Sequence, residues 1–232
     1  MCTMKTIQET QRYRDRTEAG QLLAPHVRER LGTESAVVLA LVRGGVPVAC
    51  ELARQLDAPL DVVIVRKLGA PSLPGRALGA IASDGAEVLD EPLIDQMGLS
   101  RFHVAAVADR ALAELRRCEE LYQLAEPLDL RGRTVVLADD GLATGATMRA
   151  AIHAVRARGA RRLLVAVPAG DAQSCERIAH EVDAVICPFR PDPFYSVSLW
   201  YEDYRPLTDD EVRSQLAAAT AIGTAMERHT RM

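Results

Sequence analysis

Short hydrophobic runs alternate with longer amphipathic stretches along most of this 232-residue chain. Runs of Val, Ile, Leu and Ala without interleaved polar residues are typical of strands that a parallel sheet buries on both sides. Such strands are predicted at residues 36–42, 60–66, 133–138, 162–168 and 182–187. Helical patterns are found over residues 17–31, 47–56, 100–124, 145–158, 171–180 and 209–221. This order predicts an α/β fold with a doubly wound, mainly parallel sheet flanked by helices.

Two regions interrupt the alternation. Residues 68–90 are rich in Gly and Pro, and the pair Asp84-Gly85 would turn a hairpin between strands at 77–82 and 86–89. Residues 189–204 hold six of the nine aromatic side chains of the protein, which are Phe189, Phe194, Tyr195, Trp200, Tyr201 and Tyr204. Neither region has the pattern of a core strand.

Composition is that of an ordinary folded protein, with 48% hydrophobic and 26% charged residues. The longest apolar run, residues 36–42, is far shorter than the about 20 residues that a membrane span needs. Five scattered cysteines without metal-type spacing indicate free thiols in a reducing compartment. A net charge of −4 argues against a protein that coats nucleic acid. We expect a single cytoplasmic domain over residues 1–232, with no membrane or nucleic-acid partner.

The segment from Thr134 to Thr147 carries the most informative chemistry. A predicted buried strand delivers Asp139 and Asp140 at its carboxyl end, where open α/β sheets bind ligands. A short loop of glycine and threonine then opens a helix, whose free amides and positive dipole end attract anions. Carboxylates repel phosphate but accept hydrogen bonds from hydroxyl groups, so the segment fits a ribose phosphate. The alternative is an ordinary strand-to-helix loop with two solvated acids.

This segment resembles the signature of type I phosphoribosyltransferases, which bind phosphoribosyl pyrophosphate (PRPP). The resemblance implies that Asp139 and Asp140 contact the ribose hydroxyls and, together with PRPP, are candidates to hold the Mg²⁺ cofactor. It also implies that the next residues bind PRPP and wrap its 5-phosphate, namely Gly141, Ala143, Thr144, Gly145, Ala146 and Thr147.

Two other segments agree with this resemblance. Arg43-Gly44-Gly45 follows the first predicted strand, in the place of the family's pyrophosphate loop, where small residues let backbone amides approach a ligand. Arg66 and Lys67 end the second predicted strand, where the family often places a cation against pyrophosphate. A plain turn and a solvated strand end are the alternatives. The residues expected to be catalytic are Arg43, Lys67, Asp139 and Asp140.

A narrower resemblance, to a bacterial group known only as predicted phosphoribosyltransferases, covers about residues 13–212. The stretches that carry it, beside the signature, are 66–71, 77–82 and 200–204. The implied parts are a core over 17–188, a mobile loop over 68–90 that closes on PRPP, and a small hood in the C-terminal segment 189–222. The group usually has Pro-Glu in its loop, where this chain has Pro74-Gly75-Arg76. Arg76 is therefore a candidate phosphate contact in place of the acid.

The hood is expected to bind the acceptor. In enzymes that act on 6-oxopurines, the fifth position of the signature is usually Asp, and here it is Ala143. Hypoxanthine or guanine salvage is thus disfavoured unless Asp203 or Glu202 supplies a carboxylate. We assign acceptor binding to Trp200, Tyr201 and Asp203, since an aromatic ring can stack on a flat heterocycle. The alternative is that these aromatics form a small core or a dimer contact.

The sequence thus predicts a Mg²⁺-dependent phosphoribosyltransferase of nucleotide metabolism. It would move the 5-phosphoribosyl group from PRPP to a nitrogenous, base-like acceptor and release pyrophosphate, and the resemblance implies a homodimer. The arginines near the N-terminus (Arg12, Arg14 and Arg16) are expected to form a solvated face, and the alternative is that Arg14-Asp15-Arg16 contacts the loop across a dimer. Two other functions stay open: a regulator that binds PRPP, and an enzyme that acts on phosphorylated ribose without an acceptor.

Overall fold

A five-stranded parallel sheet forms the centre of the fold. The computed structural model describes residues 12–70, 77–82, 87–122 and 127–230. The strands pair in the order β2-β1-β6-β7-β8. Their bounds are β1 (Ala36–Leu41), β2 (Leu60–Val63), β6 (Thr134–Ala138), β7 (Arg162–Ala166) and β8 (Ala184–Ile186). This confirms the α/β fold that the alternating pattern predicts.

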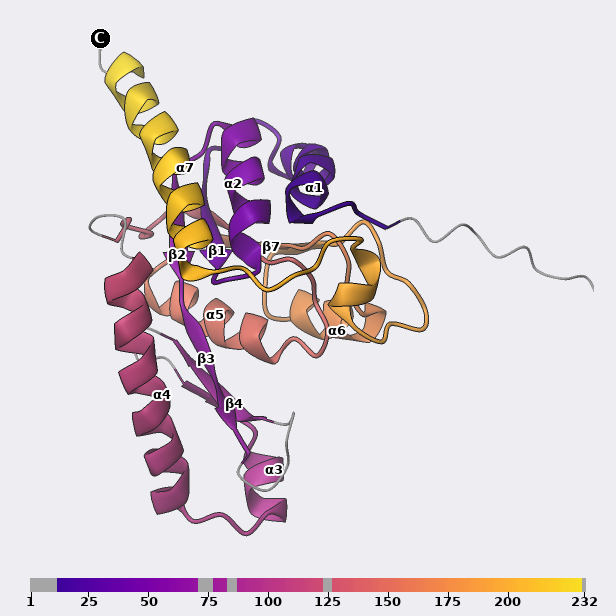
Figure 1. Ribbon diagram of the computed structural model, residues 1–232, viewed down its shortest axis with the longest axis vertical. Helices are drawn as coiled ribbons and strands as arrows, with labels where there is room; N and C mark the ends of the chain where they lie inside the picture. Colours follow the sequence, from indigo (N-terminus) through magenta and orange to yellow (C-terminus); the bar gives the residue numbers. More distant parts are fainter. Residues whose placement is uncertain (1–11, 71–76, 83–86, 123–126, 231–232) are drawn as a thin grey trace, which may run out of the picture.

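Helices cover both faces of this sheet (Figure 1). Among the helices that share one hydrophobic core are α1 (Arg16–Leu31), α2 (Gly45–Leu56), α4 (Arg101–Tyr122) and α7 (Asp209–Thr230). A second core lies beneath α5 (Ala146–Ala157) and α6 (Ala172–Ala179). All of β1 is buried because its side chains alternate between the two cores, with Val38 and Ala40 in the first and Val37 and Leu39 in the second.

The stretch predicted as one strand over 60–66 is divided between two sheets. β2 ends at Val63 and stays in the parallel sheet, whereas β3 (Val65–Gly69) pairs antiparallel with β4 (Ala77–Ala82). β4 pairs in turn with β5 (Glu87–Leu89), and α3 (Glu91–Gln96) follows. The prediction of a single strand was wrong because no glycine or proline marks the break in this apolar run.

This second sheet occupies the described part of the region that we expected to be a mobile loop. The hairpin strands predicted at 77–82 and 86–89 are confirmed by β4 and β5. A side chain at Gly79 would collide with the backbone carbonyl of Val88, so glycine permits this close pairing. The predicted turn at Asp84-Gly85 and the candidate phosphate contact Arg76 lie outside the described residues.

The segment expected to form a hood after β8 is joined by the beginning of the described chain. The backbone N–H of Tyr13 donates to the carbonyl of Trp200 at 2.9 Å, and the N–H of Glu202 donates to the carbonyl of Tyr13 at 2.9 Å. The aromatic cluster around this pairing contains Trp200, Tyr201, Tyr13, Phe189, Phe194 and Tyr204. The hood is therefore built from two segments that are far apart in the sequence. None of the described helices is long and apolar enough to cross a membrane.

Candidate functional site

A cavity of about 420 Å³ opens beside the carboxyl ends of β1 and β6. The residues that line it are Arg16, Val42, Arg43, Gly44, Arg66, Asp139, Asp140, Tyr204, Pro206 and Leu207. The structure thus brings together five of the predicted site residues from three separate segments: Arg43, Gly44, Arg66, Asp139 and Asp140. It adds Arg16, from the first turn of α1, and three residues of the hood segment that the sequence analysis did not assign to the site.

The two acids differ in their surroundings. Asp139 is half-buried and its Oδ1 accepts a hydrogen bond of 2.9 Å from the backbone N–H of Asp140. Burial and the nearby Asp140 charge raise the pKa of Asp139 well above its ordinary value, although the charges of Arg16 and Lys67 oppose the shift. Asp140 is only 6% exposed. The site therefore holds one carboxylate at the cavity surface and one carboxylate packed beneath it.

Asp140 is paired with Arg16. Arg16 Nε donates to Asp140 Oδ2 at 2.7 Å, and both side chains are 9% exposed. Arg16 Nη1 also donates to the carbonyl of Arg205 at 3.1 Å, and the guanidinium lies 4.0 Å from the ring centre of Tyr204. The expectation that Arg16 belongs to a solvated face was wrong. One signal was available, because a cation in the first turn of a helix opposes the helix dipole and needs a partner.

The Arg43 loop and the acidic loop pack closely against each other. A Cβ atom at Gly44 would lie 2.7 Å from Asp140 Cγ, and one at Gly45 would lie 2.5 Å from the carbonyl oxygen of Ala138. The two glycines are therefore required by the packing of the site itself, in addition to any approach of a ligand. The peptide bond between Val42 and Arg43 is cis.

The loop after the acids ends at the N-terminus of α5. Gly145, with φ of 80°, is the N-cap, and no side chain caps this helix end. The first-turn amides have no acceptor within the helix and can bind an anion. Ala143 and Thr144 are exposed, and Thr147 is half-buried. Among the described residues of the signature, only Asp139 and Asp140 line the cavity itself.

The predicted cations of β3 point in different directions. Arg66 lines the cavity, and its Nη2 lies 3.1 Å from Cys118 Sγ. Lys67 is exposed and is not among the lining residues, but its charge acts on Asp139. Both cations are therefore within electrostatic reach of a ligand in the cavity, and only Arg66 forms part of its wall.

The residues predicted to bind the acceptor do not line the cavity. Trp200 packs in the aromatic cluster, with ring centres 5.0 Å from Phe189 and 6.3 Å from Phe194. The Tyr201 hydroxyl donates to the backbone carbonyl of Asp140 at 2.6 Å, and burial keeps its pKa far above the ordinary value. Tyr201 therefore supports the acidic loop from outside the cavity, whereas Trp200 is part of the aromatic cluster. Of the aromatic residues that the structure describes, Tyr204 is the one that lines the cavity.

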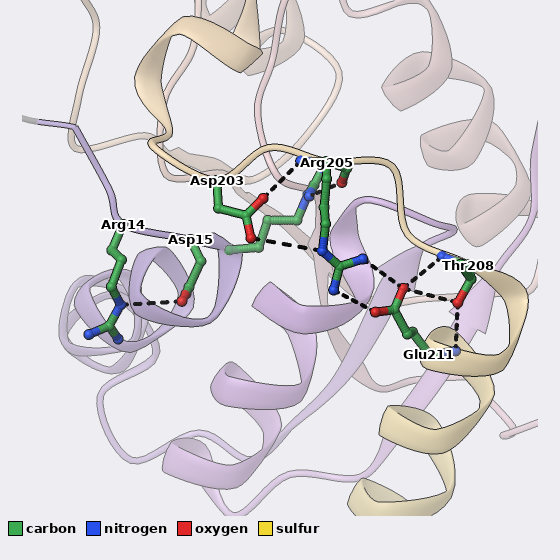
Figure 2. A network of polar contacts seen from close by, with 7 residues as sticks. Arg14, Asp15, Asp203, Arg205, Thr208 and Glu211 are labelled. Carbon is green, nitrogen blue, oxygen red and sulfur yellow. Dashed lines mark hydrogen bonds and ion pairs between the residues drawn. The ribbon is translucent and has the colours of Figure 1, made fainter.

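Asp203 belongs to a surface network (Figure 2). Its Oδ1 accepts a hydrogen bond of 3.1 Å from the backbone N–H of Arg205. Arg205 in turn donates to Glu211 through Nη1 at 3.0 Å, and Glu211 accepts from the backbone N–H of Thr208 at 2.9 Å. The N–H of Glu211 donates back to Thr208 Oγ1 at 3.2 Å. This reciprocal capping box fixes the start of α7 against the hood segment.

The acids also offer oxygen ligands of the type that Mg²⁺ prefers. The described residues include no group of three or more His, Cys, Asp or Glu side chains that could hold a metal ion. Because Arg16 occupies Asp140 Oδ2, Asp139 is the carboxylate available at the cavity surface. These residues fit a Mg²⁺ ion whose remaining ligands come from substrate and water.

Comparisons with known proteins agree with this geometry. Residues 13–195 match the family model of the phosphoribosyl transferase domain. The chain is 42% identical over 201 residues to the Mycobacterium tuberculosis proteins Rv0571c and MT0597, whose names give phosphoribosyl transferase as a provisional assignment. The match covers 86% of this chain and 45% of either relative, so the chain spans about half their length. The crystal structure of TT1426 from Thermus thermophilus has a TM-score of 0.76 at 41% identity, covering 89% of this chain and 98% of that one.

Proposed function

The chain belongs to the phosphoribosyl transferase family, and from this we propose that it transfers the 5-phosphoribosyl group of PRPP to a nitrogen acceptor and releases pyrophosphate. One observation carries the proposal. The Asp139-Asp140 pair and the Arg43-Gly44 loop face one cavity, and the uncapped N-terminus of α5 follows the acids within the same loop. Groups that accept hydrogen bonds from hydroxyls and groups that donate them to phosphate therefore belong to the same two loops.

Each part of PRPP has a matching group. Asp139 accepts hydrogen bonds from the ribose hydroxyls, since its carboxylate lies at the cavity surface. The amides at the start of α5 and the hydroxyls of Thr144 and Thr147 bind the 5-phosphate. Arg43 and Arg66 line the cavity and bind the pyrophosphate oxygens. Lys67 adds a charge from β3, and a base-like acceptor enters along Tyr204, Pro206 and Leu207.

The two acids have different roles in this proposal. Asp140 is buried against Gly44 and paired with Arg16, so it holds Arg16 and the Tyr204 ring in the cavity wall. Asp139 remains the group that meets ribose. This differs from the ribose contact that the family resemblance implies for both residues, and it makes the pair asymmetric before any ligand binds.

Transfer needs charge stabilisation and alignment. The bond from C1 of ribose to the pyrophosphate oxygen breaks with its electron pair moving to pyrophosphate. The acceptor nitrogen forms the new bond to C1 with its lone pair and releases its proton to the solvent. Arg43 and Arg66 stabilise the charge that builds on the leaving group. Asp139 orients the ribose and is the residue that would hold Mg²⁺. When bound, Mg²⁺ supplies further positive charge at the pyrophosphate oxygens.

Pyrophosphate release tests the proposal. We expect release from PRPP and Mg²⁺ with at least one member of a panel of purines, pyrimidines, deazapurines and ammonia. Asp139→Asn should lose at least about 100-fold in kcat/KM, a barrier increase of about 2.7 kcal/mol. Asp210→Asn is the matched control, because this acid is 96% exposed and forms a 4.0 Å ion pair with Arg213, away from the cavity lining.

The other outcomes identify the alternatives. Pyrophosphate release that needs no acceptor indicates an enzyme acting on phosphorylated ribose. If calorimetry detects PRPP binding but no acceptor leads to pyrophosphate release, the protein is a regulator. Analytical ultracentrifugation of the same protein tests the expected homodimer. A wild-type chain that does not bind PRPP overturns the proposal.

A further inference from the structure

Arg43 is held along one edge of its guanidinium group. Its Nε lies 3.0 Å from the Tyr122 hydroxyl and 3.0 Å from Asp209 Oδ1. The Tyr122 hydroxyl donates to Asp209 as well, which closes a three-membered cluster. Among the described residues, no hydrogen bond to Nη1 or Nη2 of Arg43 is found, and its hydrogen bond to Tyr122 is made through Nε. The edge formed by these two nitrogens is the one that binds two phosphate oxygens side by side.

The two partners of Arg43 come from helices far away in the sequence. Tyr122 is the last residue of α4 and is 2% exposed, so its ring is fixed by packing. Asp209 is the first residue of α7, directly after Thr208, whose capping box with Glu211 sets where the helix begins (Figure 2). Both partners are thus held in place by structure that does not depend on Arg43.

Without these contacts, Arg43 would lose more rotamer freedom when it binds a ligand. The Arg43 side chain is 46% exposed, and a long exposed side chain loses rotamer freedom when it binds a ligand. Contacts at Nε restrict that freedom in advance while leaving the ligand-binding edge open. We propose that Tyr122 and Asp209 are positioning residues that hold Arg43 ready to bind the pyrophosphate group, an inference that rests on the proposed function.

Tyr122 is the better residue to test. Asp209 carries a negative charge that itself repels pyrophosphate, so its removal would combine loss of positioning with relief of repulsion. Burial and the hydrogen bond to Asp209 raise the pKa of Tyr122 to about 12. The hydroxyl is therefore neutral at assay pH, and Tyr122→Phe removes the contact without changing any charge.

The experiment compares four proteins: wild type, Tyr122→Phe, Arg43→Lys and the double variant. We expect Tyr122→Phe to weaken Mg²⁺-pyrophosphate binding about fivefold by calorimetry and to raise KM for PRPP by a similar factor, with kcat within about twofold of wild type. In the Arg43→Lys background, which lacks the planar fork, Tyr122→Phe should have no further effect. Tyr195→Phe is the control, since this tyrosine is 78% exposed.

Two results overturn the inference alone. One is equal pyrophosphate affinity in wild type and Tyr122→Phe. The other is the same fivefold loss with and without Arg43, which would show that Tyr122 acts through general stability. Thermal unfolding of each variant, measured alongside, identifies any loss due to unfolding. A wild-type chain that binds neither PRPP nor pyrophosphate overturns the proposed function, and this inference falls with it.

Discussion

Replacing Arg16 by Met should lower the free energy of unfolding by several kcal/mol, about 3–5 kcal/mol from the loss of one buried ion pair. The substitution keeps a long side chain but removes the partner of Asp140 Oδ2, which is 2.7 Å away in a pair whose side chains are both 9% exposed. Asp140 would stay packed against Gly44 without a compensating charge. Breaking a buried ion pair by removing one partner costs about 3–5 kcal/mol, because the remaining charge is still desolvated.

Arg16→Met also removes two other contacts that stabilise the folded protein. The guanidinium lies 4.0 Å from the Tyr204 ring centre and donates to the Arg205 carbonyl at 3.1 Å. A cation over an aromatic ring contributes about 0.5–2 kcal/mol. At about 2–4 °C per kcal/mol for a chain of this size, we expect the Tm to fall by about 10 °C or more.

Urea unfolding of Arg16→Met measures this loss, with Arg14→Met as the matched control. Arg14 lies two residues away, and its side chain is 66% exposed in a 3.3 Å pair with Asp15 (Figure 2). Exposed pairs contribute about 0–1 kcal/mol, so the control should stay near wild type. The double variant Arg16→Met with Asp140→Asn should recover part of the loss, because the unpaired charge is gone. Equal unfolding free energies for Arg16→Met and Arg14→Met would refute the reasoning.

Two further predictions concern the same loops. The pKa of Asp139 is higher in the folded protein than in the unfolded chain, where it is about 4. The folded state is therefore favoured by the protonated side chain at pH values below about 4, and this stabilisation is lost as the pH rises through the folded pKa. Asp139→Asn should therefore unfold at higher urea than wild type at pH 7 and lose this advantage near pH 4; a constant difference across that range would contradict the assignment. Gly44→Ala places a Cβ against the Asp140 carboxylate and should cost about 1–3 kcal/mol in unfolding free energy, whereas Gly69→Ala, whose Cβ would have no atom of the described residues within 4 Å, should be nearly neutral. Thermal unfolding of both alanine variants provides the comparison, and equal effects would count against close packing at Gly44.

Local pattern was sufficient for the parallel sheet and for the acidic loop. A run such as Ala36–Leu41 has side chains that suit burial on both faces, and the structure buries all six. Asp139 follows the last residue of β6 as expected, because a strand that ends in adjacent acids and a glycine-containing loop leads directly into a helix. These features depend on neighbours within a few residues along the chain.

The hood shows what composition leaves open. Trp200 and Tyr201 were expected to bind the acceptor, with packing in a small core as the alternative, and Trp200 packs against Phe189 and Phe194. A ring buried in a small core and a ring exposed to a ligand have the same local pattern. Only the path of the segment over the sheet decides that Tyr204, and not Trp200, lines the cavity.

By itself, the sequence determined the alternation of the parallel strands with their helices, the placement of Asp139 and Asp140 at the end of a strand, and the match to phosphoribosyl transferases. Tertiary structure alone decided which side chains complete the site. Arg16 reaches Asp140 across 124 positions, and Tyr122 and Asp209 reach Arg43 from two other helices. The periodic pattern of hydrophobic and polar residues does not reveal such partners. An ion pair or hydrogen bond between distant segments depends on how helices and loops pack, and not on the residues beside each partner in the sequence.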